Sequence, residues 1–222
     1  IEGNNFRIGI DNTRKIGSSI IHSGHFEKGN LIDNPMVKAS VDNVANLQIR
    51  ANHTATHLLQ AALRQILGEH VHQSGSLVTP EKLRFDFTHF TKMTKSEIEA
   101  VEDWVNARIR ENLPVNAEVK DYQSARESGA MALFGEKYGD VVRVINVGDC
   151  SKELCGGKHV NRTGDIGCFK IISETAIAAG VRRIEAITGE AVLQLMRENE
   201  RLLEEITTLL GVSREQLPHR IE

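Results

Sequence analysis

The chain has 222 residues, 40% of them hydrophobic and 26% charged, and a formal net charge of −3. This is the composition of a globular protein of one or two domains with enough apolar material for a core. Aromatic residues make up only 5%, which argues against a broad stacking surface for single-stranded nucleic acid, and the negative charge argues against bulk capture of nucleic acid. No apolar run approaches the roughly 18–20 residues that cross a bilayer, so we expect no membrane partner. We also expect no DNA partner.

Residues 1–46 are predicted to form a β-rich first part. The runs "NFRIGI" and "GSSIIHSGHF" are separated by Gly, Asn and Asp, "PMVKASVD" alternates apolar and polar residues, and Lys28-Gly29-Asn30 has the chemistry of a hairpin turn. The strands begin abruptly, and the chain starts without Met and without a signal peptide. We therefore expect the end of a small β-barrel domain, in a segment of a longer protein.

The clearest predicted helix covers residues 52–67. Asn52 is a suitable N-cap, because its side chain can accept a free N–H of the first turn. Gly68 stands where a helix end favours a left-handed residue. The apolar positions at helical spacing are Leu58, Leu59, Ala62, Leu63, Ile66 and Leu67.

Two strands and a second helix are expected next. The runs "HQSGSLV" and "KLRFDFTHF" predict strands joined by a turn that contains Pro80, since apolar and polar residues alternate in the second run. From Thr94 to Asn112 apolar residues recur on one helix face, and Pro114 ends that helix.

The remaining elements alternate irregularly. Strands are predicted for "PVNAEVKDY", "VVRVINV", "IGCFKIISE" and "GVRRIEAIT", and a short helix with a loop for "SARESGAMALFGEKYG". A long charged helix from Glu190 to Leu210 either contributes to a coiled coil or packs on its own domain. This order favours an α+β fold with a two-layer core over a doubly wound sheet. The expected parts are residues 1–46, 47–189 and 190–222, the last a helical linker toward a further domain.

Two histidines at helical spacing stand out in "NHTATHLL". His53 and His57 are i and i+4, so they project from the same side of the helix and can share a metal ion. The protease version of this spacing needs a Glu directly after the first His as general base. Thr54 occupies that position, which excludes the metalloprotease chemistry.

A second pair of ligand types lies in "CGGKH". Cys155 and His159 are four residues apart on a Gly-rich turn, and a thiolate with imidazoles is a ligand set that zinc favours. With His53 and His57 they fill four tetrahedral positions, so we predict Zn²⁺ as the cofactor. The alternative is a structural zinc clip between helix and sheet, because a filled site leaves no position for water.

Six motifs in this order resemble the editing region of the alanyl-tRNA synthetase family: "NHTATHLL", "HQSGSLV", "LRFDF", "ALFGEKYG", "ELCGGKHV" and "GVRRIEAITG". The resemblance runs from about Arg50 to Gly189. Threonyl-tRNA synthetases and free-standing alanyl editing proteins share the His and Cys pairs, but "ALFGEKYG" and "GVRRIEAITG" favour the full alanyl enzyme. In that family the aminoacylation core would lie upstream of this segment.

The resemblance implies an aminoacyl-tRNA deacylase that hydrolyses the ester of mischarged Ser-tRNA(Ala) and Gly-tRNA(Ala) in the cytoplasm. It implies the acceptor end of tRNA(Ala) and the rest of the synthetase as partners, and His53, His57, Cys155 and His159 as zinc ligands. Gln73 matches a family position tied to editing and is expected near the aminoacyl ester. The family usually has Thr where this chain has Lys158, a cation that either contacts the terminal nucleotide or is solvated.

Several alternatives remain at this point. One is a free-standing trans-editing deacylase, which would share the His and Cys pairs, and another is a zinc-stapled RNA-binding module without catalysis. Three cysteines without framework spacing fit a reducing cytosol, and Cys150 is interpreted as a small buried hydrophobe rather than a reserve ligand. Arg182 and Arg183 either contact a tRNA phosphate or form salt bridges on a solvated strand face.

Overall fold

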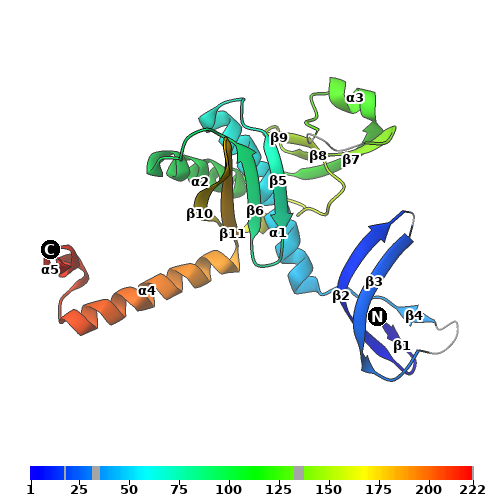
Figure 1. Cartoon of the computed structure of the whole chain (residues 1–222), viewed down its shortest axis with the longest axis horizontal. Coiled ribbons are helices and arrows are strands. Elements are labelled where there is room, and N and C mark those ends of the chain that lie inside the picture. The colour runs from blue at the N-terminus through cyan, green and yellow to red at the C-terminus, as the bar shows by residue number, and fades with distance from the viewer. Residues whose placement is uncertain (18, 32–35, 133–137, 222) are drawn as a thin grey trace. The chain divides into compact units, whose positions relative to one another are not determined.

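The computed structural model describes the chain except residues 18, 32–35, 133–137 and 222 (Figure 1). The chain divides into two compact units, Ile1–Asn43 and Val44–Glu222. The elements confirm the predicted mixed α+β class, with three antiparallel sheets and a long C-terminal helix.

The first unit is a small antiparallel sheet in the order β3-β2-β1-β4. Its strands are β1 (Glu2–Gly3), β2 (Arg7–Ile16), β3 (Ser19–Lys28) and β4 (Val37–Lys38). Phe6 is buried and packs edge-to-face on Phe26. The β-rich prediction holds for β2 and β3. The run "PMVKASVD" forms only a two-residue strand, and no closed barrel is present among the described residues.

The main sheet of the second unit has the strand order β10-β11-β6-β5. Its strands are β5 (Gln73–Val78), β6 (Leu83–Thr88), β10 (Phe169–Ala178) and β11 (Val181–Thr188). The helices α1 (Asn43–Leu67) and α2 (Lys95–Arg110) pack against one face, which Figure 1 shows behind the strands. Leu83, Phe85 and Phe87 alternate along β6 and are fully buried under these helices, as the period of two predicts. A two-layer core results.

A second, three-stranded sheet has the order β7-β8-β9. It consists of β7 (Val115–Asp121), β8 (Val141–Val147) and β9 (Ser151–Leu154), with the short helix α3 (Tyr122–Glu127) following β7. The strand β9 was not predicted. It leads directly into "CGGKH", so this sheet carries the second pair of predicted ligands to α1. Most of "ALFGEKYG" lies outside the described residues.

The first helix begins nine residues earlier than the sequence suggests, at Asn43 instead of Asn52. Asn52 is therefore an interior residue, 1% exposed, and not an N-cap. Its amide donates to the carbonyl oxygens of Thr79 (2.9 Å) and Pro80 (3.2 Å) and accepts from the Thr188 hydroxyl at 2.7 Å. Asparagine serves both as an N-cap and as a buried link from a helix to a turn and a strand, so its residue type does not tell the two apart. The first turns of α1 are exposed or only partly buried, so no apolar stripe marks the start of the helix.

The C-terminal helix α4 (Glu190–Leu210) matches its predicted range and ends at Gly211, which has φ +60°. Of the apolar residues predicted on one side of this helix, Val192 is buried, whereas Leu202 and Leu209 are exposed. Two 3-10 turns, η1 (Thr163–Ile166) and η2 (Arg214–Gln216), and the short helix α5 (Leu217–Ile221) complete the described elements. Among the described residues, no helix is long and apolar enough to span a membrane.

Candidate metal centre

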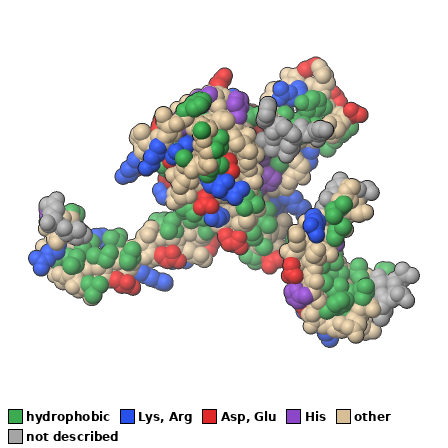
Figure 2. Space-filling view, viewed as in Figure 1, with side chains coloured by type: hydrophobic (Ala, Val, Ile, Leu, Met, Phe, Trp, Pro, Cys, Tyr) green, Lys and Arg blue, Asp and Glu red, His purple; other side chains and the backbone are tan. Residues whose placement is uncertain are grey.

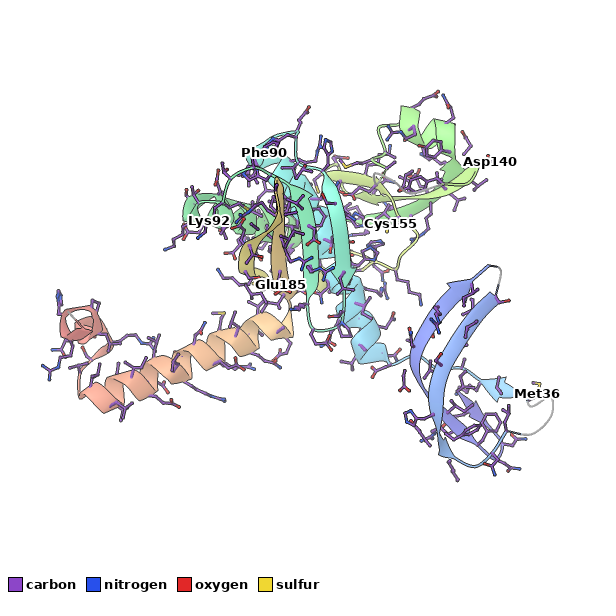
Figure 3. All side chains as sticks on the ribbon, viewed as in Figure 1. Met36, Phe90, Lys92, Asp140, Cys155 and Glu185 are labelled. Atoms are coloured by element: carbon purple, nitrogen blue, oxygen red, sulfur yellow. The ribbon has the colours of Figure 1, made fainter. Side chains whose placement is uncertain are left out.

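The four predicted ligand residues come together in the structure. Their ligand atoms all lie within 4.8 Å of one another, although the two pairs are about a hundred residues apart in the sequence. The Cys155 Sγ lies 3.4 Å from Nε2 of His53 and 3.4 Å from Nε2 of His159. His53 and His57 project from the middle of α1, whereas Cys155, labelled in Figure 3, and His159 lie on the loop after β9. The arrangement presents three nitrogens and one sulfur to a common centre.

The outer nitrogens of two imidazoles are held by buried acceptors. His57 Nδ1 is 2.7 Å from a carboxylate oxygen of Glu153, which is 4% exposed. His159 Nδ1 is 3.2 Å from the hydroxyl of Thr54. That hydroxyl donates its single proton to the carbonyl of Arg50 at 2.9 Å, so it accepts from His159. Both rings therefore carry a proton on Nδ1 and turn Nε2 toward the centre, the orientation that metal-binding histidines have.

The inner nitrogen of His57 shows that the cluster fits a metal ion. His57 Nε2 is buried and has no hydrogen-bond partner among the described residues. A buried polar atom without a partner costs roughly 1–3 kcal/mol, so native structures rarely leave one unpaired. A cation at the centre would take this lone pair together with the two other imidazoles and the thiolate. Three nitrogens and one sulfur are the ligand set of a tetrahedral zinc site.

The electrostatics of the cluster favour a thiolate. Burial alone would raise the pKa of Cys155, but hydrogen bonds from His159, His53 and His57 lower it to about 3. Burial lowers the pKa of His159 to about 4, which keeps that ring neutral. Burial also opposes charging of His57, but Glu153 and the Cys155 thiolate outweigh it and raise the pKa of His57 to about 10. The metal-free group is thus a Cys155 thiolate with a neutral His159 and a charged His57, and a metal ion at the centre would displace the proton on His57 Nε2.

The loop that carries Cys155 and His159 is held by arginines. Arg50 Nε donates to the carbonyl of His159 at 2.5 Å, and Arg143 donates to the carbonyls of Cys155 and Gly157. The N–H of Gly157 points at the Cys155 sulfur at 3.4 Å. A Cβ on Gly157 would overlap the ring of His53, so glycine is required for close approach of loop and helix.

Gln73 lies in a different place from the four ligand residues. It lines a cavity of about 750 Å³, and none of the four ligands lines that cavity. Gln60 lines the same cavity, one turn beyond His57 on α1, and its side chain is 2% exposed with an Oε1 that lacks a partner among the described residues. The expected place of Gln73 next to the ester stays a prediction.

Other functional candidates have structural partners. Arg182 pairs with Glu174, and Arg183 pairs with Asp86 through two hydrogen bonds of 2.6 and 2.8 Å. These pairs agree with the salt-bridge interpretation of the two arginines. Cys150 packs against the hydrophobic core, and burial raises its pKa, as expected for a small hydrophobe.

Sequence reasoning missed the residues that hold the ligands. The sequence analysis used Thr54 only to exclude metalloprotease chemistry, which needs a Glu at that position. Its position one residue after His53 puts it on the loop side of α1, which no periodicity reveals. Glu153 is two residues before Cys155 in the polar run "SKEL", so no apolar pattern in the sequence signalled its burial.

Comparison with known proteins identifies relatives of this chain. Residues 142–185 match the family "Threonyl and Alanyl tRNA synthetase second additional domain". The alanine–tRNA ligases of Legionella pneumophila strain Corby and strain Philadelphia 1 are each 48% identical over 219 residues, which is 99% of this chain and 26% of the relative. The chain therefore spans about a quarter of the length of these curated relatives. It is a homologue of a segment of alanine–tRNA ligases, which confirms the resemblance found in the motifs.

Proposed function

We propose that this homologue of an alanine–tRNA ligase segment is an editing hydrolase, which cleaves the ester of mischarged Ser-tRNA(Ala) and Gly-tRNA(Ala). The observation that supports it is the cluster of His53, His57, Cys155 and His159, whose ligand atoms converge within 4.8 Å in a region that matches the second additional domain of threonyl and alanyl tRNA synthetases. The metal in this proposal is Zn²⁺, and the partner is the acceptor end of tRNA(Ala).

A separate hydrolytic site compensates for the limited selectivity of an aminoacylation site. An alanine pocket distinguishes glycine by only the ~1–3 kcal/mol of one methyl-sized group, and it rejects an added hydroxyl poorly. Hydrolysis of the wrong ester at a separate site removes both errors. The requirements are a water, a means to stabilise the oxyanion, and groups that hold the 3′ end of the tRNA.

A Zn²⁺ held by the three imidazoles and the thiolate would supply positive charge to anchor or polarise the bound ester. The chain's own groups do the rest. Of the two glycines in the loop, Gly157 directs its N–H at the Cys155 sulfur, whereas the N–H of Gly156 makes no hydrogen bond to a described residue. The N–H of Gly156 is thus the donor of this turn that is left for an oxyanion. Gln73 and Gln60 present amide groups in the 750 Å³ cavity for the aminoacyl group or its water.

The competing role for the metal is structural. Four protein ligands close a tetrahedral zinc site, and closed sites are typical of structural zinc. In that case the metal joins α1 to the loop after β9, and the chemistry is confined to the cavity that Gln60 and Gln73 line. Both versions remain deacylases. They differ in whether activity follows zinc content when the fold is preserved.

The experiment is hydrolysis of Ser-tRNA(Ala) by this chain, with zinc content and thermal unfolding measured on the same samples. Cys155→Ala and Gln73→Ala are the test variants. Cys168→Ala is the matched control, because Cys168 is also half-buried but lies outside the cluster. We expect rapid hydrolysis by the wild type and Cys168→Ala, and loss in both test variants. A folded, zinc-loaded wild type that leaves the ester intact would contradict the proposal.

A further inference from the structure

A second, basic cavity adjoins the metal cluster. It has a volume of about 380 Å³ and includes the ligand His159 in its wall, together with Arg50, Arg143, Lys158, Asn116 and Asn161. Its size is that of a small-ligand site. No aspartate or glutamate is among its lining residues. Three cationic side chains therefore meet beside the metal loop without an acid in the same wall.

The charges of these three side chains are not neutralised by the described part of the protein. Arg50 donates to a backbone carbonyl and to the amide oxygen of Asn161, and Arg143 donates to backbone carbonyls. Neutral acceptors satisfy N–H groups but leave the positive charge. Lys158 is exposed and makes no hydrogen bond or ion pair with any residue that the structure describes.

The other basic side chains around the main sheet provide the contrast. Arg183 is paired with Asp86, Arg182 with Glu174, Lys82 with Glu185, and Lys170 with Glu102. Figure 2 shows this mixture, with acidic and basic side chains intermingled over the sheet that faces the viewer. In a chain of net charge −3, three cations without an acidic partner share one cavity wall, and that wall includes a residue of the metal cluster. Such a concentration of charge selects an anion.

We propose that this cavity binds a backbone phosphate of the RNA strand whose 3′ end reaches the metal cluster, with Lys158 as the ion-pairing residue. The inference rests on the proposed function for the identity of the strand. Arg50 and Arg143 add positive potential to the cavity and hold the loop in place. The Lys158 side chain has no partner among the described residues and can move with the phosphate. A phosphodiester is the fitting anion because it offers charge without demanding a planar, bidentate partner, which suits a lysine ammonium. The contact positions the strand and reads no sequence.

The test is binding of a fluorescent single-stranded RNA of eight nucleotides ending in CCA with a free 3′ hydroxyl, measured by anisotropy at several salt concentrations. Zinc-loaded wild type, Lys158→Ala and Lys158→Arg are compared. Lys95→Ala is the matched control, because Lys95 is an exposed lysine on α2 that does not line this cavity. Free adenosine, which lacks the phosphate, is the second probe.

For Lys158→Ala we expect about five- to tenfold weaker RNA binding at low salt, with unchanged adenosine binding and zinc content. The slope of log K against log salt should fall by about 0.7, the value for one phosphate contact on a single strand. Lys158→Arg should restore the slope. An unchanged slope in Lys158→Ala, an equal loss in Lys95→Ala, or an RNA that the wild type does not bind would each overturn the phosphate site.

The free hydroxyl separates this inference from the proposed function. Because the probe carries no ester, its binding does not depend on hydrolysis. If the slope depends on Lys158 but Ser-tRNA(Ala) stays intact, the deacylase proposal fails and the phosphate site stands. If the ester is cleaved but the salt dependence of RNA binding is the same in Lys158→Ala and wild type, only the phosphate site is refuted.

Discussion

Thr54→Val tests whether the hydroxyl next to His53 prepares the metal cluster. Thr54 is fully buried, and its hydroxyl accepts from His159 Nδ1 and from the Val160 N–H, both at 3.2 Å, while it donates to the Arg50 carbonyl. Valine keeps the shape and the β-branch but removes the acceptor. Two buried donors, one on the His159 ring and one on the backbone, are left without partners.

The size of the effect follows from these two donors. Each buried donor without a partner costs about 1–3 kcal/mol, so Thr54→Val should lower the free energy of unfolding by about 2–6 kcal/mol. For a domain of this size that corresponds to a decrease in Tm of about 4–24 °C. Because the ring of His159 loses the group that fixes its tautomer, zinc affinity should also fall by about 10–100-fold.

Thr56→Val is the matched control. Thr56 is buried on the same helix, and its hydroxyl donates to the carbonyl four residues earlier at 2.9 Å, as that of Thr54 does, but it accepts no hydrogen bond from the loop. The assays are urea unfolding of metal-free and zinc-loaded protein and a zinc competition titration with a chromophoric chelator. Equal losses of stability and zinc affinity in the two variants would refute the role of Thr54 as acceptor.

Three further predictions concern the contacts around α1 and α2. Gly157→Ala should weaken zinc binding in a chelator titration, because the added Cβ would overlap the ring of His53. Gly156→Ala is the control and should leave zinc binding unchanged, because its Cβ would meet nothing within 4 Å. Equal zinc affinities of the two variants would contradict the close approach of the loop to His53. Asn52→Asp should destabilise the protein by about 3–5 kcal/mol at neutral pH, because it buries a carboxylate where two carbonyl oxygens need donors. The native pKa of that carboxyl is raised, so the loss should grow as pH rises above about 4 in unfolding titrations; an N-cap would tolerate the change at every pH. Thr94→Ala should cost about 1 kcal/mol near neutral pH, because Thr94 caps α2 in a capping box with Glu97. The backbone and side-chain hydrogen bonds from Thr94 lower the pKa of Glu97, so this loss should shrink as the pH falls below 4.5, the ordinary pKa of a glutamate. A loss that does not depend on pH would argue against the capping box.

The sequence predicted the secondary structure best where apolar residues recur on one face of a helix or strand. The helices at 95–110 and 190–210 and the hairpin at 73–88 were predicted close to their observed ranges, because apolar periodicity and turn residues are local signals. The start of α1 was misplaced, since Asn52 is used for contacts with Thr79, Pro80 and Thr188 that have no local trace. The strand β9 was missed because it is only four residues long.

The sequence by itself supplied the candidate ligands, because a helical spacing of four brings His53 to His57 and the Gly-rich turn lets Cys155 approach His159. Only the tertiary structure decided how these groups are prepared. The Thr54 hydroxyl meets His159 across 105 residues, and Arg50 meets the same loop across 109. Hydrogen bonds between segments so far apart depend on the packing of α1 against the loop after β9, and they leave no periodic or spacing signal in the chain. The concentration of unpaired cations beside the cluster has the same origin, since Arg50, Arg143 and Lys158 belong to three separate segments that only folding joins.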